Sequence, residues 1–366
     1  MLRLLHFADL HLDRAFGGQS YVGCDGAQRR TLLRTALQWA VDLALEREAD
    51  AVTIGGDLFE LEHVTSDSAA YVSRQLGRLK CPVLVAAGNH DYSSPASPYR
   101  TTEWPANVTL ALEPRPTRLD LGEVVLWAVG YAGREMDPAV LRTFDIPADD
   151  LQRHILVLHG VDLSSVSPDL RWGGLGLRAD RVREIGFQHV LLGHIHQGQV
   201  GELMSWPGSP VPLDAGEAAG GHGALWVEVD DDGIHVEAVP ADLLGYDTAS
   251  VDVTDVSDST QLENQLRKAL EPLQAADKLV TCRLWGRRRR GLTIDPTVLA
   301  ASIQDLARGV RVIDATAAEI DLEDLAREPN ARGQAVARLL ADGSAPALWA
   351  ANLIVEAFEG DLVIPG

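Results

Sequence analysis

Five short apolar runs in the first part of the chain are each followed at once by histidine, aspartate or asparagine. These polar tips are Asp9 to His11, Asp57, Asn89 to Asp91, His159, and His194 to His196. Each run has the length and composition of a buried strand, and a packed core has little use for ionisable groups at such points. Because the carboxyl ends of parallel strands meet at one edge of a sheet, the tips are expected to converge.

Helices are expected between the first three runs. Apolar residues recur at helical spacing over residues 28–48, and a second helix is expected at about 65–79. The resulting β-α-β-α-β order is typical of a parallel sheet with helices packed on its faces. Later strands, near 224–230 and 234–239, alternate more openly, as antiparallel strands do. We therefore predict that residues 1–243 form an α/β domain.

The pattern changes near residue 245. Residues 244–316 are predicted to form a smaller α/β domain, with strands at 248–253, 279–285 and 310–313 and helices at 259–274 and 296–307. Residues 317–366 are predicted to form a C-terminal helical tail. Its two expected helices lie within 330–358 and are separated by the break from Gly343 to Pro346.

Composition limits the class of protein further. The chain has 366 residues and a formal net charge of −21, which favours solubility and repels nucleic acid in bulk. No apolar run approaches the roughly 20 residues of a membrane span, and residues 1–7 indicate an opening strand, not a signal peptide. Its three distant cysteines favour reduced thiols over a disulfide framework. We therefore expect a cytoplasmic protein without membrane association.

The residue types at the five tips indicate metal binding. Aspartate, histidine and asparagine suit borderline and hard divalent cations, and a carboxylate can bridge two ions. Two ions about 3.5–4 Å apart form a clamp that activates water and stabilises in-line displacement at phosphorus. The tips therefore predict a dinuclear centre for phosphoester hydrolysis.

The motifs resemble those of the calcineurin-like metallophosphoesterase family. They are Asp9-Leu10-His11, Gly56-Asp57, Gly88-Asn89-His90-Asp91, His159-Gly160 and Gly193-His194-Ile195-His196, in the family's order over roughly residues 1–240. Three flanking segments are similar to those of the SbcD-type DNA-repair exonucleases, including their YhaO-like branch. These segments are residues 6–13, Gly56 to Phe59 and Trp206 to Pro210. The resemblance implies a four-layer αββα sandwich, followed by the α/β capping domain and the helical tail.

The resemblance also implies a role for each tip. Asp9, His11, Asp57 and His196 would hold the first metal, and Asp57, Asn89, His159 and His194 the second, with Asp57 bridging. His90 would face the phosphate and protonate the leaving oxygen, and Asp91 would orient His90. Manganese is the metal expected for such a site.

One position departs from the family pattern. Many nuclease members carry histidine or aspartate three residues after the bridging aspartate, where this chain has Glu60. The role of that position is therefore open.

Structural roles are expected for four histidines that lie at strand starts or within strands, namely His6, His154, His189 and His235. His222 is expected in a loop.

The arginine run Arg287, Arg288, Arg289 and Arg290 is the one dense basic segment. It could grip DNA phosphates, with Trp285 as a stacking surface, or form a solvated turn, and the sequence favours neither. The resemblance further implies two partners, DNA and an SbcC-type coiled-coil ATPase, and the ATPase would dock near the C-terminal tail. It also implies that the protein is a homodimer.

Three functions follow from these features. The first is a manganese-dependent DNA exonuclease or endonuclease of double-strand-break repair, which works with the ATPase. The second keeps the metal centre but gives it a small phosphodiester or phosphomonoester substrate. The third is a non-catalytic scaffold for an ATPase or DNA ends, which the intact ligands and His90 disfavour. The second domain and the arginine run favour DNA, whereas the net charge favours a small substrate.

Overall fold

The computed structural model describes the chain except residues 18–19, 148, 165–172, 320 and 360–366. In the described part, close contacts define two compact units. The first contains Met1–Asp247, Leu273–Thr281 and Gln304–Arg311, and the second contains Thr248–Pro272, Cys282–Ile303 and Val312–Gly366. The predicted domain boundaries after residues 243 and 316 stay predictions. The two compact units divide the chain differently, since Leu273–Thr281 and Gln304–Arg311 of the predicted second domain belong to the first unit. Leu279, for example, packs into the core of the first unit.

The first unit contains two sheets. The first has the order β13 (Ile234–Pro240), β12 (Gly223–Val229), β1 (Leu2–Phe7), β2 (Ala51–Ile54), β3 (Val83–Ala86) and β4 (Val108–Ala111). Strands β1 to β4 run parallel, and β12 and β13 are antiparallel additions. The expected parallel and antiparallel segments are therefore confirmed.

The second sheet carries the later histidines. Its order is β10 (Gln199–Val200), β11 (Met204–Trp206), β9 (His189–Gly193), β7 (Arg153–Asp162), β6 (Val124–Ala128) and β5 (Thr117–Asp120), and β8 (Leu175–Leu177) pairs with β7. Strand β7 continues through His159, where the sequence predicted its end, because its last residues, Gly160 to Asp162, pair with β8.

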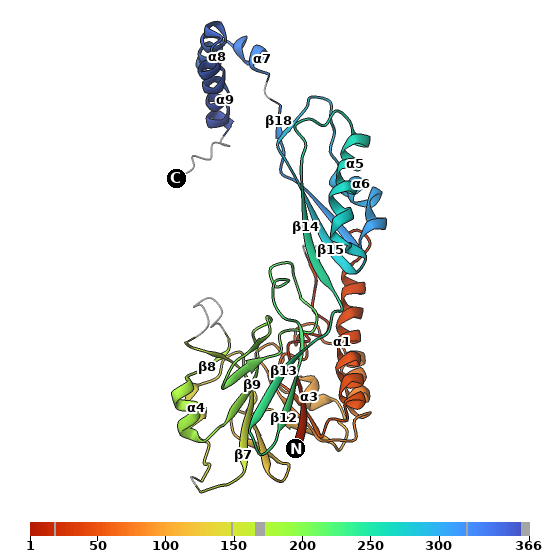
Figure 1. Cartoon of the computed structure of the whole chain (residues 1–366), viewed down its shortest axis with the longest axis vertical. Helices are drawn as coiled ribbons and strands as arrows, with labels where there is room; N and C mark the ends of the chain where they lie inside the picture. Colours follow the sequence, from red (N-terminus) through yellow and green to blue (C-terminus); the bar gives the residue numbers. More distant parts are fainter. Residues whose placement is uncertain (18–19, 148, 165–172, 320, 360–366) are drawn as a thin grey trace. The chain divides into compact units, whose positions relative to one another are not determined.

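Three apolar cores hold the layers together. The central core joins the two sheets, since it contains Leu84 of β3 and Leu225 of β12 together with Leu126 of β6 and Val157 of β7. Helices cover the outer faces: α1 (Gly26–Glu46) and α2 (Ser66–Leu76) pack on the first sheet, and the 3-10 turn η1 (Pro138–Arg142) and α4 (Ala179–Ile185) pack on the second. Figure 1 shows α1 and α4 on opposite sides of the strands. The expected αββα order is therefore confirmed.

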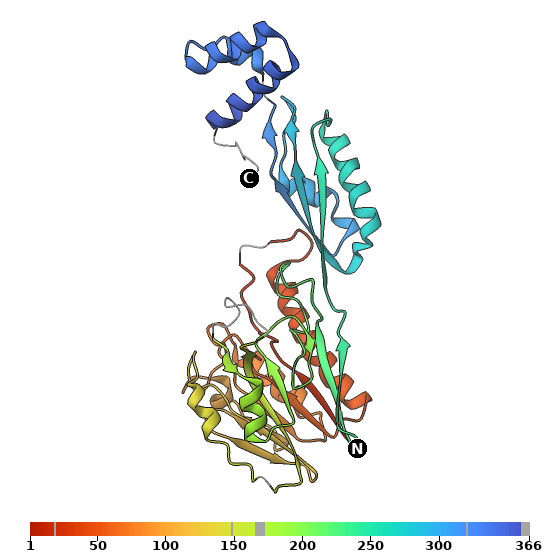
Figure 2. The same cartoon turned by 60° about the vertical axis from the view of Figure 1, so that its left-hand side comes forward.

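The smaller sheet consists of β14 (Gly245–Asp252), β15 (Lys278–Trp285) and β17 (Gly309–Asp314). Its helices are α5 (Ser259–Leu270), which lies along one face in Figure 2, and α6 (Pro296–Ser302). The predicted β-α-β-α-β order is confirmed. Short strands β16 (Arg287–Arg288) and β18 (Ala317–Ala318), which the sequence analysis missed, pair with each other.

The tail has three helices in its described part. They are α7 (Leu322–Ala326), α8 (Ala331–Asp342) and α9 (Ala345–Glu359). The predicted break between the last two is confirmed at Gly343, whose φ of 67° is in the left-handed region that favours glycine. The remaining short helices and turns are α3 (Pro98–Thr101), η3 (Glu271–Leu273), η4 (Ala275–Asp277) and η5 (Gln304–Leu306).

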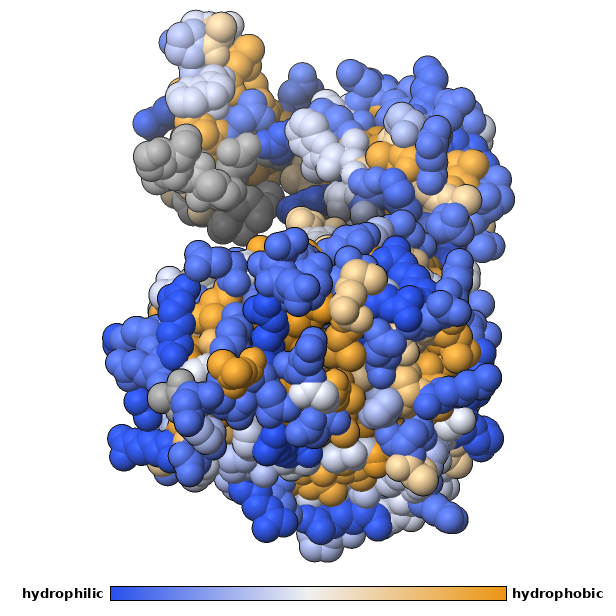
Figure 3. Space-filling view, turned by 60° about the horizontal axis from the view of Figure 1, so that its bottom comes forward, coloured by the Kyte–Doolittle hydropathy of each residue, from blue (hydrophilic) through white to orange (hydrophobic). Residues whose placement is uncertain are grey.

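One face of the molecule is mainly hydrophilic. The face in Figure 3 is dominated by hydrophilic residues, with hydrophobic residues in separate smaller patches. Among the described residues, no helix combines the length and hydrophobicity that crossing a bilayer requires.

Candidate metal centre

The two sheets bring the five polar tips together. Asp9, Asp57 and Asn89 follow the adjacent parallel strands β1, β2 and β3, whereas His159 lies in β7 and His194 follows β9 of the other sheet. Contacts join the two groups directly. The backbone N–H of His194 donates to both carboxylate oxygens of Asp9, each at 3.0 Å. The predicted convergence is therefore observed.

The backbone at the tips is strained in a specific way. Asp9, His11, Asp57 and His194 have φ angles of 56°, 45°, 52° and 93°. Residues other than glycine rarely adopt this left-handed region, and its cost is accepted mainly where function requires it. The sharp turns hold the side chains at the edge of the sheets instead of letting them continue the strands.

Two overlapping groups of ligand atoms form the centre. Atoms of Asp9, His11 and His196 lie within 4.8 Å of one another, and so do atoms of Asp9, Asp57 and His159. The Oδ2 atom of Asp57 lies 3.6 Å from Nε2 of His11 and 3.3 Å from Nε2 of His159. One carboxylate oxygen therefore faces both groups, which is the arrangement that a bridging ligand requires.

Hydrogen bonds on the outer side of the imidazoles turn lone pairs into the centre. Nδ1 of His11 lies 2.7 Å from Glu60, and Nδ1 of His196 lies 2.8 Å from Glu217. An ionised carboxylate only accepts, so each Nδ1 donates and each Nε2 of a neutral ring carries a lone pair. The two Nε2 atoms are 3.1 Å apart. Lone pairs at this distance repel unless a cation lies between them.

The residues of the second ligand group are oriented by their contacts in the same way. Nδ1 of His159 donates to the carbonyl of Gly55 at 3.1 Å, which turns its Nε2 toward Asp57. Oδ1 of Asn89 is buried and has no hydrogen-bond partner among the described residues. Buried polar atoms are rarely left unpaired, and amide oxygens are good ligands for hard cations. The residues present therefore fit two metal ions.

Glu60 and Glu217 are site residues that the sequence analysis did not assign. Glu60 contacts both His11 and, through its other oxygen, Nδ1 of His90 at 3.2 Å. Burial disfavours the charged form of Glu60, but the hydrogen bonds from these two histidines outweigh it and hold the pKa of Glu60 below its usual range. Glu60 thus ties a candidate metal ligand to the predicted proton donor. The departure from the family pattern was the available signal for Glu60, and Glu217 had none.

The predicted role of Asp91 stays a prediction, but its hydrogen bonds in the structure go to groups other than the His90 ring. Its Oδ1 accepts from the backbone N–H of Gly88 at 2.6 Å, and its Oδ2 accepts from the backbone N–H of Leu58 at 2.7 Å and the hydroxyl of Tyr99 at 2.5 Å. Both oxygens are thus used to hold the loops after β2 and β3, and Glu60 supplies the contact to the His90 ring. Burial, with repulsion from Asp57, raises the pKa of Asp91 to about 6.

Gly88 is required by close packing against the centre. A Cβ atom at this position would lie 2.2 Å from Oδ1 of Asp57. The same Asp57 atom accepts a hydrogen bond of 2.9 Å from the backbone N–H of His90. The absence of a side chain at Gly88 therefore lets the loop that carries Asn89 and His90 close over Asp57.

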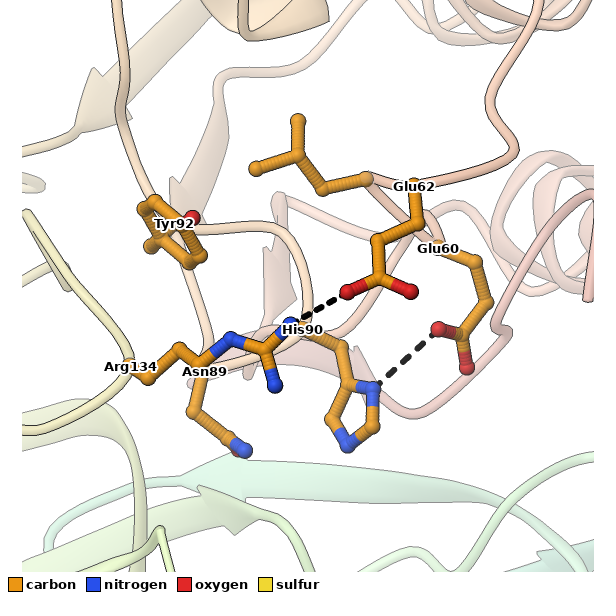
Figure 4. Close-up of a pocket in the computed structure, with 7 residues that line it drawn as sticks. Glu60, Glu62, Asn89, His90, Tyr92 and Arg134 are labelled. Carbon is orange, nitrogen blue, oxygen red and sulfur yellow. Dashed lines mark hydrogen bonds and ion pairs between the residues drawn. The ribbon is translucent and has the colours of Figure 1, made fainter.

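His90 lies at the open side of the centre, with 46% of its side chain exposed. It lines a cavity of about 150 Å³ with Glu60, Leu61, Glu62, Asn89, Tyr92 and Arg134. Figure 4 shows the side chains of His90 and Asn89 pointing the same way, with Glu60 beside the His90 ring and Arg134 paired with Glu62. Substrate can therefore reach His90 from solvent.

The other histidines have the structural contacts that were expected. Nδ1 of His6 lies 2.9 Å from Thr53 Oγ1, His154 accepts from the Trp127 indole at 3.0 Å, and His189 contacts Ser205 at 3.1 Å. His235 is exposed beside Asp230. His222 is in a loop, as predicted, and one of its ring nitrogens lies 2.9 Å from the carbonyl of Glu217.

The arginine run is partly neutralised within its own unit. Arg288 lies 3.3 Å from Asp314, and Arg290 lies 3.1 Å from Asp321 and 2.9 Å from Asp324. Trp285 is 49% exposed. The run is therefore neither a plain solvated turn nor a set of unopposed positive charges.

A family model for calcineurin-like phosphoesterase matches residues 2–198. This match covers more than half of the chain and contains every candidate ligand. The chain belongs to the calcineurin-like phosphoesterase family, as its motifs predicted.

Curated relatives are about one quarter identical to this chain over the aligned residues. The uncharacterized metallophosphoesterase YhaO of Bacillus subtilis is 26% identical over 77% of this chain and 71% of its own length. The DNA double-strand break repair protein Mre11 of Sulfurisphaera tokodaii is 24% identical over 63% of this chain and 60% of its own length. A subunit of the nuclease SbcCD of Escherichia coli K12 is 24% identical over 59% of this chain and 62% of its own length. The chain thus spans less than two thirds of the last two relatives.

Solved structures with a similar arrangement include a dimetal phosphatase from Danio rerio. It is 10% identical, with a TM-score of 0.41, over 64% of this chain and 95% of that one.

Replacing Glu60 with glutamine is expected to lower kcat by about 10- to 100-fold, the usual effect of removing a carboxylate that orients a catalytic or metal-binding histidine. The amide keeps the size of the side chain but loses the charge that holds His11 and His90. Steady-state hydrolysis of a phosphodiester measures the effect. Glu184→Gln, an exposed change on α4, is the control. Equal rates for the two variants would show that Glu60 has no positioning role.

Proposed function

We propose that this chain is a metal-dependent DNA nuclease that hydrolyses phosphodiester bonds at a dinuclear centre. The observation that carries the proposal is the position of Asp57, whose Oδ2 atom faces ligands from both sheets. The choice of DNA is supported by the relatives that are named as a DNA double-strand break repair protein and a nuclease subunit.

The proposed ligands divide into two sets that share one residue. Asp9, His11, Asp57 and His196 would hold one ion, and Asp57, Asn89, His159 and His194 the other. When bound, such ions activate water and neutralise charge on the phosphate. Glu60, Glu217 and the carbonyl of Gly55 would keep the imidazoles of His11, His196 and His159 in the ligating tautomer.

His90 is the proposed proton donor to the leaving oxygen. The hydrogen bond to Glu60 raises the pKa of His90 above its ordinary value, which favours the protonated ring that a proton donor requires. A protonated imidazole at the exposed rim can give this proton to a departing alkoxide, which needs one. The backbone N–H of His90, bound to Asp57, keeps the ring at a defined position beside the ligands.

Manganese, a cytoplasmic location, a homodimer and a coiled-coil ATPase partner are further parts of the proposal. The name of the Escherichia coli relative describes one subunit of a nuclease, SbcCD, which supports a partner. Manganese fits a site of carboxylate, amide and imidazole ligands. Metal analysis of the purified full chain tests the choice of manganese. Its mass in solution tests the homodimer.

A small phosphodiester or phosphomonoester substrate is the second candidate. It is favoured by the net charge of −21 and by the carboxylates that pair with Arg288 and Arg290. A non-catalytic scaffold is the third candidate, and the accessible proton donor His90 argues against it.

Digestion of end-labelled linear DNA with manganese tests the proposal. The wild-type chain should degrade the DNA, and the chelated protein should not. If the DNA stays intact while a chromogenic phosphodiester is cleaved, the small-substrate candidate replaces it. If neither is cleaved, even with the ATPase, the scaffold candidate is favoured.

Replacing all four arginines from Arg287 to Arg290 with alanine is expected to weaken DNA binding and make it less sensitive to salt. Each arginine that contacts a phosphate contributes about one unit to the slope of log affinity against log salt. Because carboxylates compete for Arg288 and Arg290, we expect the slope to fall by about one to two units. Binding at several salt concentrations measures it, with Arg181→Ala, an exposed change on α4, as control. An unchanged slope would assign the run to structure alone.

A further inference from the structure

A second cavity adjoins the candidate metal centre. Its volume is about 70 Å³, several times what one ordered water needs. The lining residues are Arg14, Ala15, Phe16, Gly17, Arg29, Leu213 and Asp214. Two guanidinium groups therefore line one small cavity in a chain that is strongly acidic as a whole.

Arg29 is buried, and no carboxylate of the described residues forms an ion pair with it. It is 2% exposed, and its Nη2 donates to the carbonyl of Leu213 at 2.6 Å and to the hydroxyl of Tyr246 at 2.5 Å. Its guanidinium lies 3.8 Å from the centre of the Phe16 ring. Its Nε is buried and has no hydrogen-bond partner among the described residues. All its described partners are uncharged, although a buried cation usually requires an anion.

Arg14 adds a second positive charge at the cavity. Its side chain is 31% exposed, and its Nη1 is 3.7 Å from Oε1 of Glu60, which is an ion-pair distance too long for a hydrogen bond. Among the described lining residues, Asp214 is the one carboxylate, and its Oδ1 accepts the backbone N–H of Gly216 at 2.7 Å. The formal charge of the lining is therefore positive.

Short contacts connect the cavity with the metal centre on two sides. Glu60, beside Arg14, also holds His11 at 2.7 Å. Leu213, which accepts from Arg29, donates its backbone N–H to Glu217 at 2.7 Å, and Glu217 holds His196 at 2.8 Å. Both arginines are thus separated from a candidate ligand by one or two residues. The cavity therefore lies beside the residues that orient His11 and His196.

We propose that this cavity binds a phosphate group, namely the one that neighbours the scissile phosphate in a polynucleotide. Guanidinium groups match phosphate in charge and hydrogen-bond geometry, and the cavity has room for one such group but not for a nucleoside. The inference rests on the proposed function, because it makes the substrate a chain of phosphates instead of a single diester. Arg14 and Arg29 would then select polynucleotides.

Calorimetric titration of the metal-free full chain with inorganic phosphate tests the site without catalysis. We expect Arg14→Ala to weaken binding by about tenfold, the loss of one charge-assisted contact. Asp214→Asn should tighten binding, because it removes the repelling charge. Arg29→Met removes the buried charge and should also weaken binding, and the Arg14 and Asp214 variants decide the matter if Arg29→Met does not fold. Equal affinity of wild type, Arg14→Ala and Asp214→Asn would overturn the proposal.

Kinetics with dinucleotides test the same site in the loaded enzyme. Three substrates are compared, which carry a terminal phosphate at the 5′ end, at the 3′ end, or at neither. In the wild type, one phosphorylated substrate should have a kcat/KM about tenfold above that of the unphosphorylated one. In Arg14→Ala this ratio should fall to near one.

The outcomes separate the inference from the proposed function. Hydrolysis of all three dinucleotides with a ratio of one in the wild type would overturn the phosphate site and leave the phosphodiesterase in place. If no dinucleotide is hydrolysed, digestion of end-labelled DNA decides the nuclease proposal, and the phosphate titration decides whether the cavity binds the anion.

Discussion

Replacing His90 with asparagine is expected to lower kcat for DNA hydrolysis by at least about 100-fold while two metal ions remain bound. General acid catalysis by a positioned side chain contributes about 10²–10⁴-fold, and His90 is the accessible imidazole whose ring contacts Glu60 at the open side of the centre. Its ring belongs to neither group around Asp9 but to a third one with His11 and Glu60, so we expect the ligands around Asp9 to stay in place. Rates on labelled DNA and metal content by mass spectrometry measure the two effects.

The neighbouring residue provides the matched comparison. Asn89→Ala removes the buried Oδ1 atom and should weaken binding of the second ion, with activity restored at high metal concentration. The His90 variant should not respond to added metal. If His90→Asn loses its metals, the role of His90 as proton donor is wrong.

Replacing Asp57 with asparagine is expected to weaken metal binding by more than about 100-fold and to abolish hydrolysis. Changes of residues that only support ligands already cost about 10- to 100-fold, and Asp57 faces the ligands of both proposed ions. The neutral amide cannot balance two cations, although it keeps the shape of the side chain. Titration with manganese, followed by calorimetry, measures the loss.

Asp13→Asn is the control for Asp57. Asp13 is also an aspartate with a left-handed φ, 67°, but its carboxylate accepts from the backbone N–H of Thr65 at 2.8 Å, away from the ligands. The control should keep both ions and full activity. Two ions bound with wild-type affinity in Asp57→Asn would rule out the bridging role.

The main fold and the candidate ligands could be predicted because their signals are local. A short apolar run that ends in Asp9 or Asp57 defines both a buried strand and the point where a polar side chain leaves it. The order of strands and helices then restricts the sheet to a few arrangements, in which the carboxyl ends meet. Strand β7 was predicted too short at His159, because its extension depends on pairing with β8.

Asp91 shows how far contacts depend on tertiary structure. The family resemblance implied that Asp91 orients His90, whereas in the structure Asp91 turns inward to the backbone of Gly88 and Leu58. Glu60, which is 30 residues away in sequence, reaches His90 instead. The partner of a side chain depends on how two loops meet, which neighbouring residues in the sequence do not specify.

The sequence by itself determined the α/β class, the five polar tips and the metallophosphoesterase family, because strand ends and residue types are local properties. The tertiary structure alone decided that Asp57 lies between two ligand groups, that Glu60 and Glu217 orient the imidazoles, and that Arg29 is buried beside a cavity. These features depend on segments far apart in the chain that packing brings within a few ångströms. Their chemistry exists only once the two sheets face each other.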